Sequence, residues 1–182
     1  MLFPGGRLPL RIFEQRYLEM EKASLRDNSP FGVCLIREGA EVGAAATPAA
    51  VGTLARIGAW DMPQLGLLHV TAVGEARFRI LERRVQPDGL ARARVEVLQA
   101  EPDAAVPEGC SRCVRLLERL IESERGLFEP PQHLESAAWV ASRLAEVLPL
   151  PLDTKQELLE IDNACERLER VNALLANARA AS

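Results

Sequence analysis

The hydrophobic pattern of the chain changes its period near residue 101, and this change limits the fold more than any other feature of the sequence. Before it, short segments alternate apolar and polar residues, as strands with one buried face do. After it, apolar residues recur every three or four positions, as on one face of a helix. The segment 101–107 between them has two prolines and few bulky side chains. We therefore expect an α+β chain with a β-rich unit over residues 1–104 and a helical unit over residues 105–182.

The segment 8–20 predicts a strand that runs directly into a helix. Its first residues are apolar, and Pro9 suits the entry of a strand, where no ladder N–H is needed. From Phe13 onward the period becomes helical, since Phe13 and Tyr17 are four residues apart and share one helical face. The helix is expected over residues 14–26, and this spacing favours a core position for both aromatic rings.

The rest of the first unit reads as further strands, expected over residues 31–37, 51–60, 65–73, 75–85 and 90–99. A loop is expected over 38–50, with a short extended piece around Val42, and a turn over 61–63. Residues 86–89 have the composition of a tight hairpin turn. In that hairpin the apolar residues predict a buried face, and the arginines predict a solvent-exposed face. Mostly antiparallel strands of this kind predict a partly open barrel.

The second unit is expected to be a three-helix bundle. The helical pattern covers residues 110–125 and 134–148, and a third helix begins at Asp153. Asp153 followed by Gln156 three residues later has the pattern of a capping box, in which each side chain satisfies a backbone N–H.

Several segments resemble the N-terminal, substrate-binding domain of Lon proteases, in a free-standing form without the ATPase and peptidase parts. The matching blocks are LFPGGRLPLRIFEQRY (2–17), FGVCLI (31–36), VGTLARI (51–57), GEARFRILE (74–82) and LPLPLDTKQELLEIDNACERLERVNALL (148–175). The resemblance implies a PUA-like barrel followed by a helical bundle, and binding of polypeptides without catalysis. Family members usually carry a further apolar strand of the PLFPL type before the LFPG motif. Either the native start lies upstream of Met1 or the chain lacks that strand, which would leave a sheet edge open.

The sequence contains no pattern typical of a motor or a hydrolase. No G-x-x-x-x-G-K-[ST] loop is present, and two histidines and two lysines offer no nucleophile paired with a base. Cys110 and Cys113 form the single C-x-x-C pair, and buried small side chains explain it better than zinc or redox chemistry. We expect no catalytic residue, metal or cofactor. The sparse cysteines and the absence of an apolar run of about 20 residues indicate a cytoplasmic protein without a membrane span.

Six arginines near the hairpin raise the alternative of a PUA-like RNA-binding protein. They are Arg77, Arg79, Arg83, Arg84, Arg92 and Arg94. Acidic residues lie among them, the net charge of the chain is −4, and few aromatic rings are available for stacking on bases. A solvated sheet face is the favoured interpretation, and a nucleic-acid partner is not expected.

The leading hypothesis is a module that binds unfolded or partly folded polypeptides through exposed apolar segments. Its candidate peptide-binding residues are Phe13, Tyr17, Trp60 and Met62. Trp60 and Met62 lie where a strand is expected to end, and a large ring beside a flexible side chain makes an adaptable apolar contact. A protease or a chaperone is a candidate partner. An open sheet edge would also allow a homodimer, because unpaired strand N–H and C=O groups recruit other strands.

Overall fold

The chain folds into two compact units, Met1–Ala100 and Glu101–Ser182, which we call the strand unit and the helical unit. The structure is a computed structural model that describes residues 1–39, 46–100, 102, 104–124 and 126–180. The expected α+β class is confirmed, since antiparallel strands fill the first unit and helices fill the second. Each unit is described by itself.

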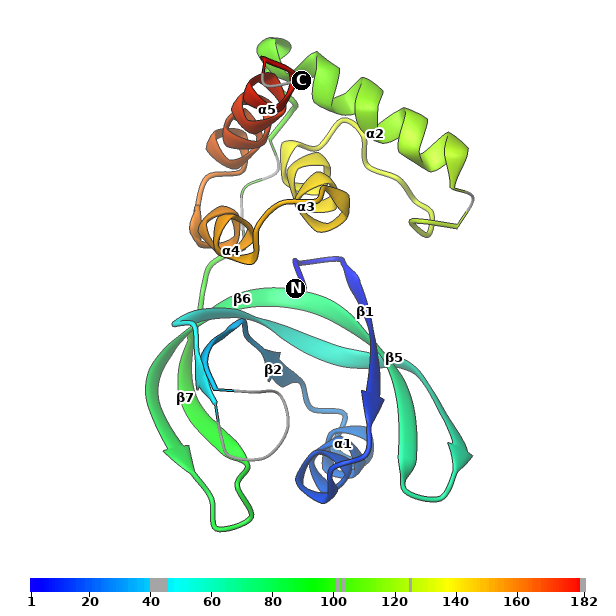
Figure 1. Cartoon of the computed structure of the whole chain (residues 1–182), viewed down its shortest axis with the longest axis vertical. Coiled ribbons are helices and arrows are strands. Elements are labelled where there is room, and N and C mark those ends of the chain that lie inside the picture. Colours follow the sequence, from blue (N-terminus) through cyan, green and yellow to red (C-terminus); the bar gives the residue numbers. More distant parts are fainter. Residues whose placement is uncertain (40–45, 101, 103, 125, 181–182) are drawn as a thin grey trace. The chain divides into compact units, whose positions relative to one another are not determined.

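Within the described residues, the strand unit contains seven strands and one helix, and Figure 1 shows how they are arranged. In chain order they are β1 (Arg7–Ile12), α1 (Gln15–Asp27), β2 (Phe31–Val33), β3 (Ile36–Glu38), β4 (Thr47–Pro48), β5 (Val51–Gln64), β6 (Leu67–Val85) and β7 (Ala91–Val97). The predicted passage from strand directly into helix is confirmed, with Phe13 and Glu14 between β1 and α1.

The long strand β6 organises the sheet. One edge of β6 pairs with β5, and its other edge pairs first with β1 and then with β7, all antiparallel. β2 continues the sheet beyond β5, while β3 and β4 form a separate two-stranded ribbon. Within the described residues these strands are curved but leave the sheet open, so no closed barrel forms (Figure 1).

Three expected boundaries were wrong. The turn expected over 61–63 lies inside β5, and the chain reverses at Gly66, whose φ of +84° favours glycine. The strand expected over 31–37 is divided into β2 and β3. Of the loop expected over 38–50, residues 40–45 with Val42 lie outside the described residues, and β4 occupies part of the remainder.

Two hydrophobic clusters form the part of the strand-unit core that lies under α1. One joins Leu18 of α1 to Ile12, Leu68 and Val70, with Tyr17 packed against it. The other contains Leu2, Phe31, Ala55 and Ala72, and Met20 of α1 packs against it. Both clusters lie where β1, β5 and the first half of β6 meet α1, so the helix covers this part of the sheet.

The hairpin of β6 and β7 is less covered than the alternation predicts. Ala91, Ala93 and Val97 are exposed although they were expected on a buried face, and only Val95 of that set is half-buried. Arg77 was expected on a wet face but is 4% exposed. Alternation shows which residues share a face of a strand, but it cannot tell which of the two faces another element covers.

In the part of the helical unit that the structure describes, four α-helices follow a short 3-10 turn, where three helices were expected. They are η1 (Glu108–Cys110), α2 (Ser111–Ser123), α3 (Ala137–Val147), α4 (Leu152–Glu160) and α5 (Ala164–Ala180). The third predicted helix is divided because Ile161 is extended and the Asn163 side chain accepts a hydrogen bond from the Glu166 N–H at 3.0 Å, as a cap does. The N-cap of α4 is Pro151, so the predicted capping role of Asp153 was wrong.

The core of the helical unit consists of side chains that are completely buried. Leu117, Val140, Leu144, Leu158, Leu168 and Val171 are fully buried. The buried guanidinium of Arg167 donates from Nε to the Leu158 carbonyl at 2.8 Å and also bonds the Ile161 carbonyl. A charged group buried with hydrogen-bond acceptors can hold the break between α4 and α5 in place.

Candidate functional site

A cavity of about 780 Å³ opens in the strand unit between α1, β2, the β3–β4 ribbon and the β6–β7 hairpin. Its size falls in the range of about 300–1,000 Å³ that is usual for binding pockets. Most lining side chains are apolar, among them Tyr17, Met20, Ile36, Leu54, Phe78, Ile80, Ala91, Ala93 and Val95. The cavity therefore offers apolar surface that the fold itself leaves partly uncovered.

The N-terminal end of α1, which forms one wall of the cavity, is fastened to the β6–β7 turn. Arg16 donates from Nη1 to the Gly89 carbonyl at 2.8 Å and pairs with Glu14 at 2.9 Å. Its guanidinium also lies 4.7 Å from the centre of the Tyr17 ring, a cation–π contact. Gly89 has a φ of +83°, and a β-carbon there would lie 3.1 Å from the arginine. The glycine thus allows both the turn and the approach of the helix.

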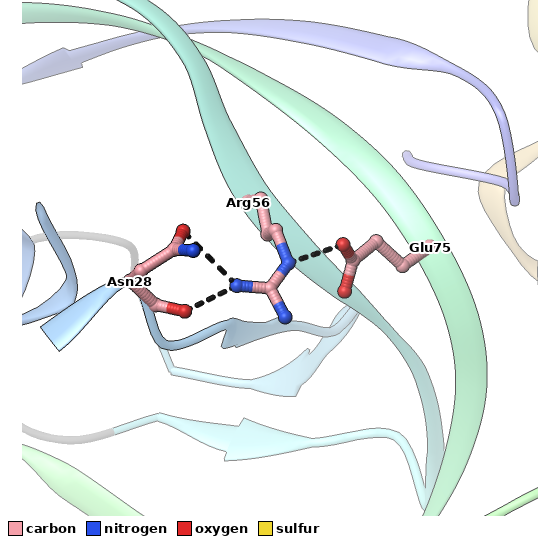
Figure 2. Close-up of polar contacts among 3 residues, drawn as sticks. All are labelled: Asn28, Arg56 and Glu75. Carbon is pink, nitrogen blue, oxygen red and sulfur yellow. Dashed lines mark hydrogen bonds and ion pairs between the residues drawn. The ribbon is translucent and has the colours of Figure 1, made fainter.

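The C-terminal end of α1 is fastened to the sheet by Arg56 of β5. Figure 2 shows this guanidinium between Asn28, which ends the helix, and Glu75 of β6. Arg56 bonds the Glu75 carboxylate and the Asn28 carbonyl, and its Nη1 lies 3.2 Å from the Asn28 Oδ1. Both ends of α1 are therefore fixed by polar contacts. These contacts, and not the apolar lining of the cavity, define the distance between α1 and β7.

The floor of the cavity is built around Phe78. A β-carbon at Gly32 would lie 2.9 Å from the Phe78 ring, and one at Gly52 would lie 2.8 Å from it. The ring fits between two strands only because both positions lack side chains. The floor is consequently rigid, whereas Ile80 and Val95 beside it remain half-buried.

Among the described residues, the charges at the cavity are mostly positive. Three arginines, Arg26, Arg83 and Arg92, line it together with one aspartate, Asp27. Arg26 and Asp27 hold each other in hydrogen bonds of 2.8 and 2.9 Å, so the remaining charge comes from Arg83 and Arg92. An apolar surface with a basic rim suits a ligand that carries apolar groups and some negative charge.

Glu21 of α1 is a buried carboxyl group that the sequence analysis did not identify. Its side chain is fully buried, and neither oxygen has a hydrogen-bond partner in the described structure. Burial away from water disfavours the charged form and raises the pKa of Glu21 to about 7. The signal was present in the sequence, because Glu21 follows Leu18 and Tyr17 at helical spacing and so shares their covered side.

The structure separates the four predicted peptide-binding residues. Tyr17 lines the cavity and packs against the core, whereas the other three are not among the residues that line the cavity. Phe13 is 56% exposed, so the favoured core position for its ring was wrong. Trp60 and Met62 are 56% and 40% exposed.

The register of the strands shows how Phe13, Trp60 and Met62 are related. Phe13 follows Ile12, which lies opposite Leu68, and Trp60 lies opposite Val70 on the other edge of β6. These three side chains therefore flank the same end of β6, near the β5–β6 turn. Sequence reasoning named them as candidate peptide-binding residues but did not find the cavity, because its walls come from segments that are far apart in the chain.

The six arginines do not form one basic face. Arg77 is buried, and Arg83 extends to the cavity side, where it bonds the Ala46 carbonyl. Arg79 pairs with Glu96 at 3.4 Å, and Arg94 pairs with Glu82 at 2.8 Å. These contacts compensate much of the positive charge and do not favour the RNA-binding alternative.

Cys110 and Cys113 are free thiols buried in the helical unit. Burial raises the pKa of both thiols, to about 11 for Cys113, which keeps them in the less reactive protonated form. Among the described residues, no group of three or more His, Cys, Asp or Glu side chains is placed to hold a metal ion. In the same part of the chain, no helix is both long and apolar enough to cross a membrane.

Comparison with protein families gives a match over almost the whole chain. Residues 1–177 match the family described as the ATP-dependent protease La (LON) substrate-binding domain. The Lon protease of Paraburkholderia phytofirmans is 29% identical over 180 residues, which is 94% of this chain and 22% of that protein. Protein cereblon of Gallus gallus is 32% identical over 114 residues, which is 61% of this chain and 24% of that protein. The chain thus spans about a quarter or less of the length of these curated relatives.

Two solved structures have a similar fold. The crystal structure of a Lon N-terminal domain protein from Xanthomonas campestris has a TM-score of 0.80 and 35% identity, covering 95% of this chain and 92% of that one. The N-terminal domain of the Mycobacterium avium complex Lon protease has a TM-score of 0.59 at 18% identity, covering 94% of this chain and 90% of that one, and supports the fold alone.

Proposed function

Because the chain belongs to the family of LON substrate-binding domains, we propose that it binds unfolded or partly folded polypeptides and carries out no reaction on them. The observation that supports this function most directly is the largely apolar cavity beside α1, whose lining side chains Ile36, Ile80 and Val95 are half-buried. Apolar side chains of a client chain would complete their burial there, and each Å² removed from water contributes about 25 cal/mol.

Tyr17 is the predicted residue that this proposal places in contact with the client. Its ring lines the cavity on the side of α1, opposite the hairpin. Phe13, Trp60 and Met62 would form a second apolar contact at the other end of β6, used by longer client segments. Exposed rings and a flexible methionine are typical of surfaces that accept varied apolar partners.

The partner that receives the client is proposed from the family alone. The matched relatives include Lon proteases, of which this chain spans about a fifth. We propose that the chain presents bound segments to a separate protease or chaperone. Purification of the whole chain from cells that contain its native proteome, followed by identification of bound proteins, would test for such a partner.

Binding can be measured by fluorescence anisotropy of a labelled, permanently unfolded reporter, such as reduced and carboxymethylated α-lactalbumin, titrated with the whole chain. We expect binding that Ile80→Asp weakens at least tenfold, because a carboxylate would then project into the apolar cavity. Leu81→Asp is the matched control, since Leu81 is the next residue on β6, is exposed and does not line the cavity. The affinity of the Leu81→Asp variant for the reporter should stay within about twofold of that of the original chain.

Met20→Ser, on the opposite wall, is a second test in case Ile80→Asp disturbs the sheet. Circular dichroism establishes whether each variant is folded. Equal affinity of the original chain, the Ile80 variant and the Met20 variant would contradict binding in the cavity. Absence of any binding to the unfolded reporter would contradict the proposed function itself.

A further inference from the structure

One edge of β7 is free. The hydrogen bonds at the two ends of the strand show which of its residues direct their backbone groups to this edge. The Gln86 N–H donates to the Leu90 carbonyl at 2.8 Å, and the Leu98 N–H donates to the Arg77 carbonyl at 2.9 Å. Residues of a strand direct their N–H and C=O groups to alternate sides. The even-numbered residues from 90 to 98 therefore face β6, and the odd-numbered residues face away from it.

Four residues thus present their backbone groups to the outside: Ala91, Ala93, Val95 and Val97. In the part of the chain that the structure describes, β7 pairs with β6 alone (Figure 1), and no hydrogen bond to the outward backbone groups of these four residues is found. A row of unpaired N–H and C=O groups is a template for another strand.

The side chains of the same residues connect this edge to the cavity. Ala91, Ala93 and Val95 line the cavity, and they are small enough to leave room beside them. In an antiparallel pair, residues directly opposite each other point to the same face. Alternate side chains of an added strand would therefore point to the cavity side, and the others to the outer face.

The face of β7 opposite that of Ala91 and Ala93 is basic, and Arg92 on this face also reaches the rim of the cavity. Arg92 lies directly opposite Arg84 of β6, an unfavourable arrangement of like charges. Arg92 donates to the Gln86 side chain at 3.0 Å, a neutral partner, so its charge is not compensated by this bond. Arg94 is the next residue on the same face and has one carboxylate partner, Glu82. Acidic side chains on an added strand would meet both arginines.

We propose, on the basis of the polypeptide-binding function above, that the client chain docks as an added antiparallel strand on the free edge of β7. The preferred segment has about seven residues and alternates small apolar with acidic side chains. The apolar residues lie opposite Ala91, Ala93, Val95 and Val97, and those opposite Ala91, Ala93 and Val95 reach the cavity. The acidic residues lie opposite Arg92 and Arg94.

The probe is a fluorescein-labelled peptide with the core Val-Thr-Val-Glu-Val-Glu-Val, which places threonine opposite Glu96 and the two glutamates opposite Arg94 and Arg92. Its partner peptide replaces both glutamates with lysine. We expect the glutamate peptide to bind the whole chain at least tenfold more tightly than the lysine peptide at low salt, because like charges would then face each other. Arg92→Glu should reduce or invert this preference.

Backbone pairing is tested on both partners. Ala93→Pro removes an N–H that points away from β6, so the sheet should stay intact while peptide affinity falls about tenfold. Ala93→Thr keeps the N–H and also adds bulk at this cavity-lining position, so the loss caused by missing backbone pairing is the difference in affinity between the two variants. In the peptide, N-methylation of a valine should weaken binding about tenfold, whereas N-methylation of a glutamate should change it less than threefold, because only the valines direct their N–H groups to β7.

Four outcomes separate this proposal from the general function. If N-methylation at valine and glutamate has equal effects, strand addition is overturned. If Ala93→Pro leaves binding unchanged while Ile80→Asp abolishes it, the client occupies the cavity without pairing to β7, and the proposed function still holds. If neither the peptide nor the unfolded reporter binds, both fail. If Ala93→Pro converts a dimer to a monomer and no peptide binds, the occupant of the edge is a second copy of the chain.

Discussion

The two halves of β6 are one continuous strand with different surroundings. The first half, at Leu68, Val70 and Ala72, lies between β1 and β5 under α1, and all three side chains are buried. The second half pairs with β7, and Ile80 and Val85 on its cavity side remain partly exposed. Both halves carry the same alternation of apolar residues, so the difference comes from what covers them.

This contrast indicates that the two halves of β6 have different roles in the strand unit. The covered half supplies the hydrophobic burial that holds α1 and the sheet together. The uncovered half keeps apolar side chains accessible beside a tightly packed floor, and its partner strand β7 keeps an unpaired backbone edge accessible. A protein that only needed stability would gain by covering this surface, so its exposure favours a binding role.

The largest expected effect tests the contrast directly with the same substitution in each half. Leu68→Ala should lower the free energy of unfolding by about 3 kcal/mol, because it leaves a void in a buried cluster. Leu81→Ala should lower it by less than about 1 kcal/mol, because Leu81 is 48% exposed. Urea unfolding can be followed by Trp60 fluorescence in a Trp139→Phe background, which leaves one tryptophan, in the strand unit. Equal losses would show that both halves are equally packed.

Much of the fold could be predicted from the sequence because local patterns control it. The passage from β1 into α1, the β6–β7 hairpin and the change to helices after residue 100 all follow from hydrophobic period and turn residues. The misplaced turn at 61–63 has a local explanation as well. Asp61, Met62 and Pro63 have turn composition, yet Gly66 supplies the positive φ that the reversal needs.

The candidate site was less predictable because it depends on coverage. Phe78, Ile80 and Val95 were recognised as the apolar face of a hairpin, and such a face is normally packed. Whether α1 would lie over it or beside it depends on distant contacts, such as Arg16 with Gly89 and Arg56 with Asn28. No pattern within one segment contains this information.

The second effect concerns the helix that covers the first half of β6. The pKa of Glu21 is raised from 4.5 to about 7 in the folded protein, so the folded state binds more protons than the unfolded state between these values. The free energy of unfolding should therefore decrease as pH rises from about 4.5 to about 7, and its Glu21 contribution should be constant above that. The total loss is on the order of 3 kcal/mol.

Glu21→Gln isolates this contribution, because the amide does not titrate. We expect the variant to be more stable than the original chain at pH 8 by about 3 kcal/mol and nearly equal to it at pH 4.5. Thermal unfolding across this pH range measures the difference. Glu19→Gln, at an exposed position of the same helix, is the control and should show little change. A Glu21 difference that does not vary with pH would contradict the buried, ionisable state.

The third effect tests how tightly the cavity floor around Phe78 is packed beside the uncovered half of β6. Gly52→Ala would place a β-carbon 2.5 Å from the Cys34 Sγ and 2.8 Å from the Phe78 ring. We expect a loss of about 2 kcal/mol, since added volume in a packed site forces side chains and backbone to shift. Gly109→Ala, which has nothing within 4 Å of the new atom, is the matched control. Similar urea midpoints for the two variants would mean that the residues around Gly52 can shift to accept the added atom without loss of stability.

The smallest effect compares one ion pair in each half of β6. Arg56→Ala removes the link from Glu75 to the Asn28 carbonyl at the end of α1, and we expect a loss of about 1 kcal/mol, because a hydrogen bond to the helix end is lost with a partly exposed ion pair. Arg94→Ala removes an exposed pair with Glu82 and should change stability by less than about 0.5 kcal/mol. Hydrogen exchange of α1 amides gives a more specific readout, since loosening of the last turn before Asn28 should appear only in the Arg56 variant. If both variants leave exchange in α1 unchanged, the position of the helix over the first half of β6 depends on its apolar contacts alone, and the polar links at its ends do not set the width of the cavity.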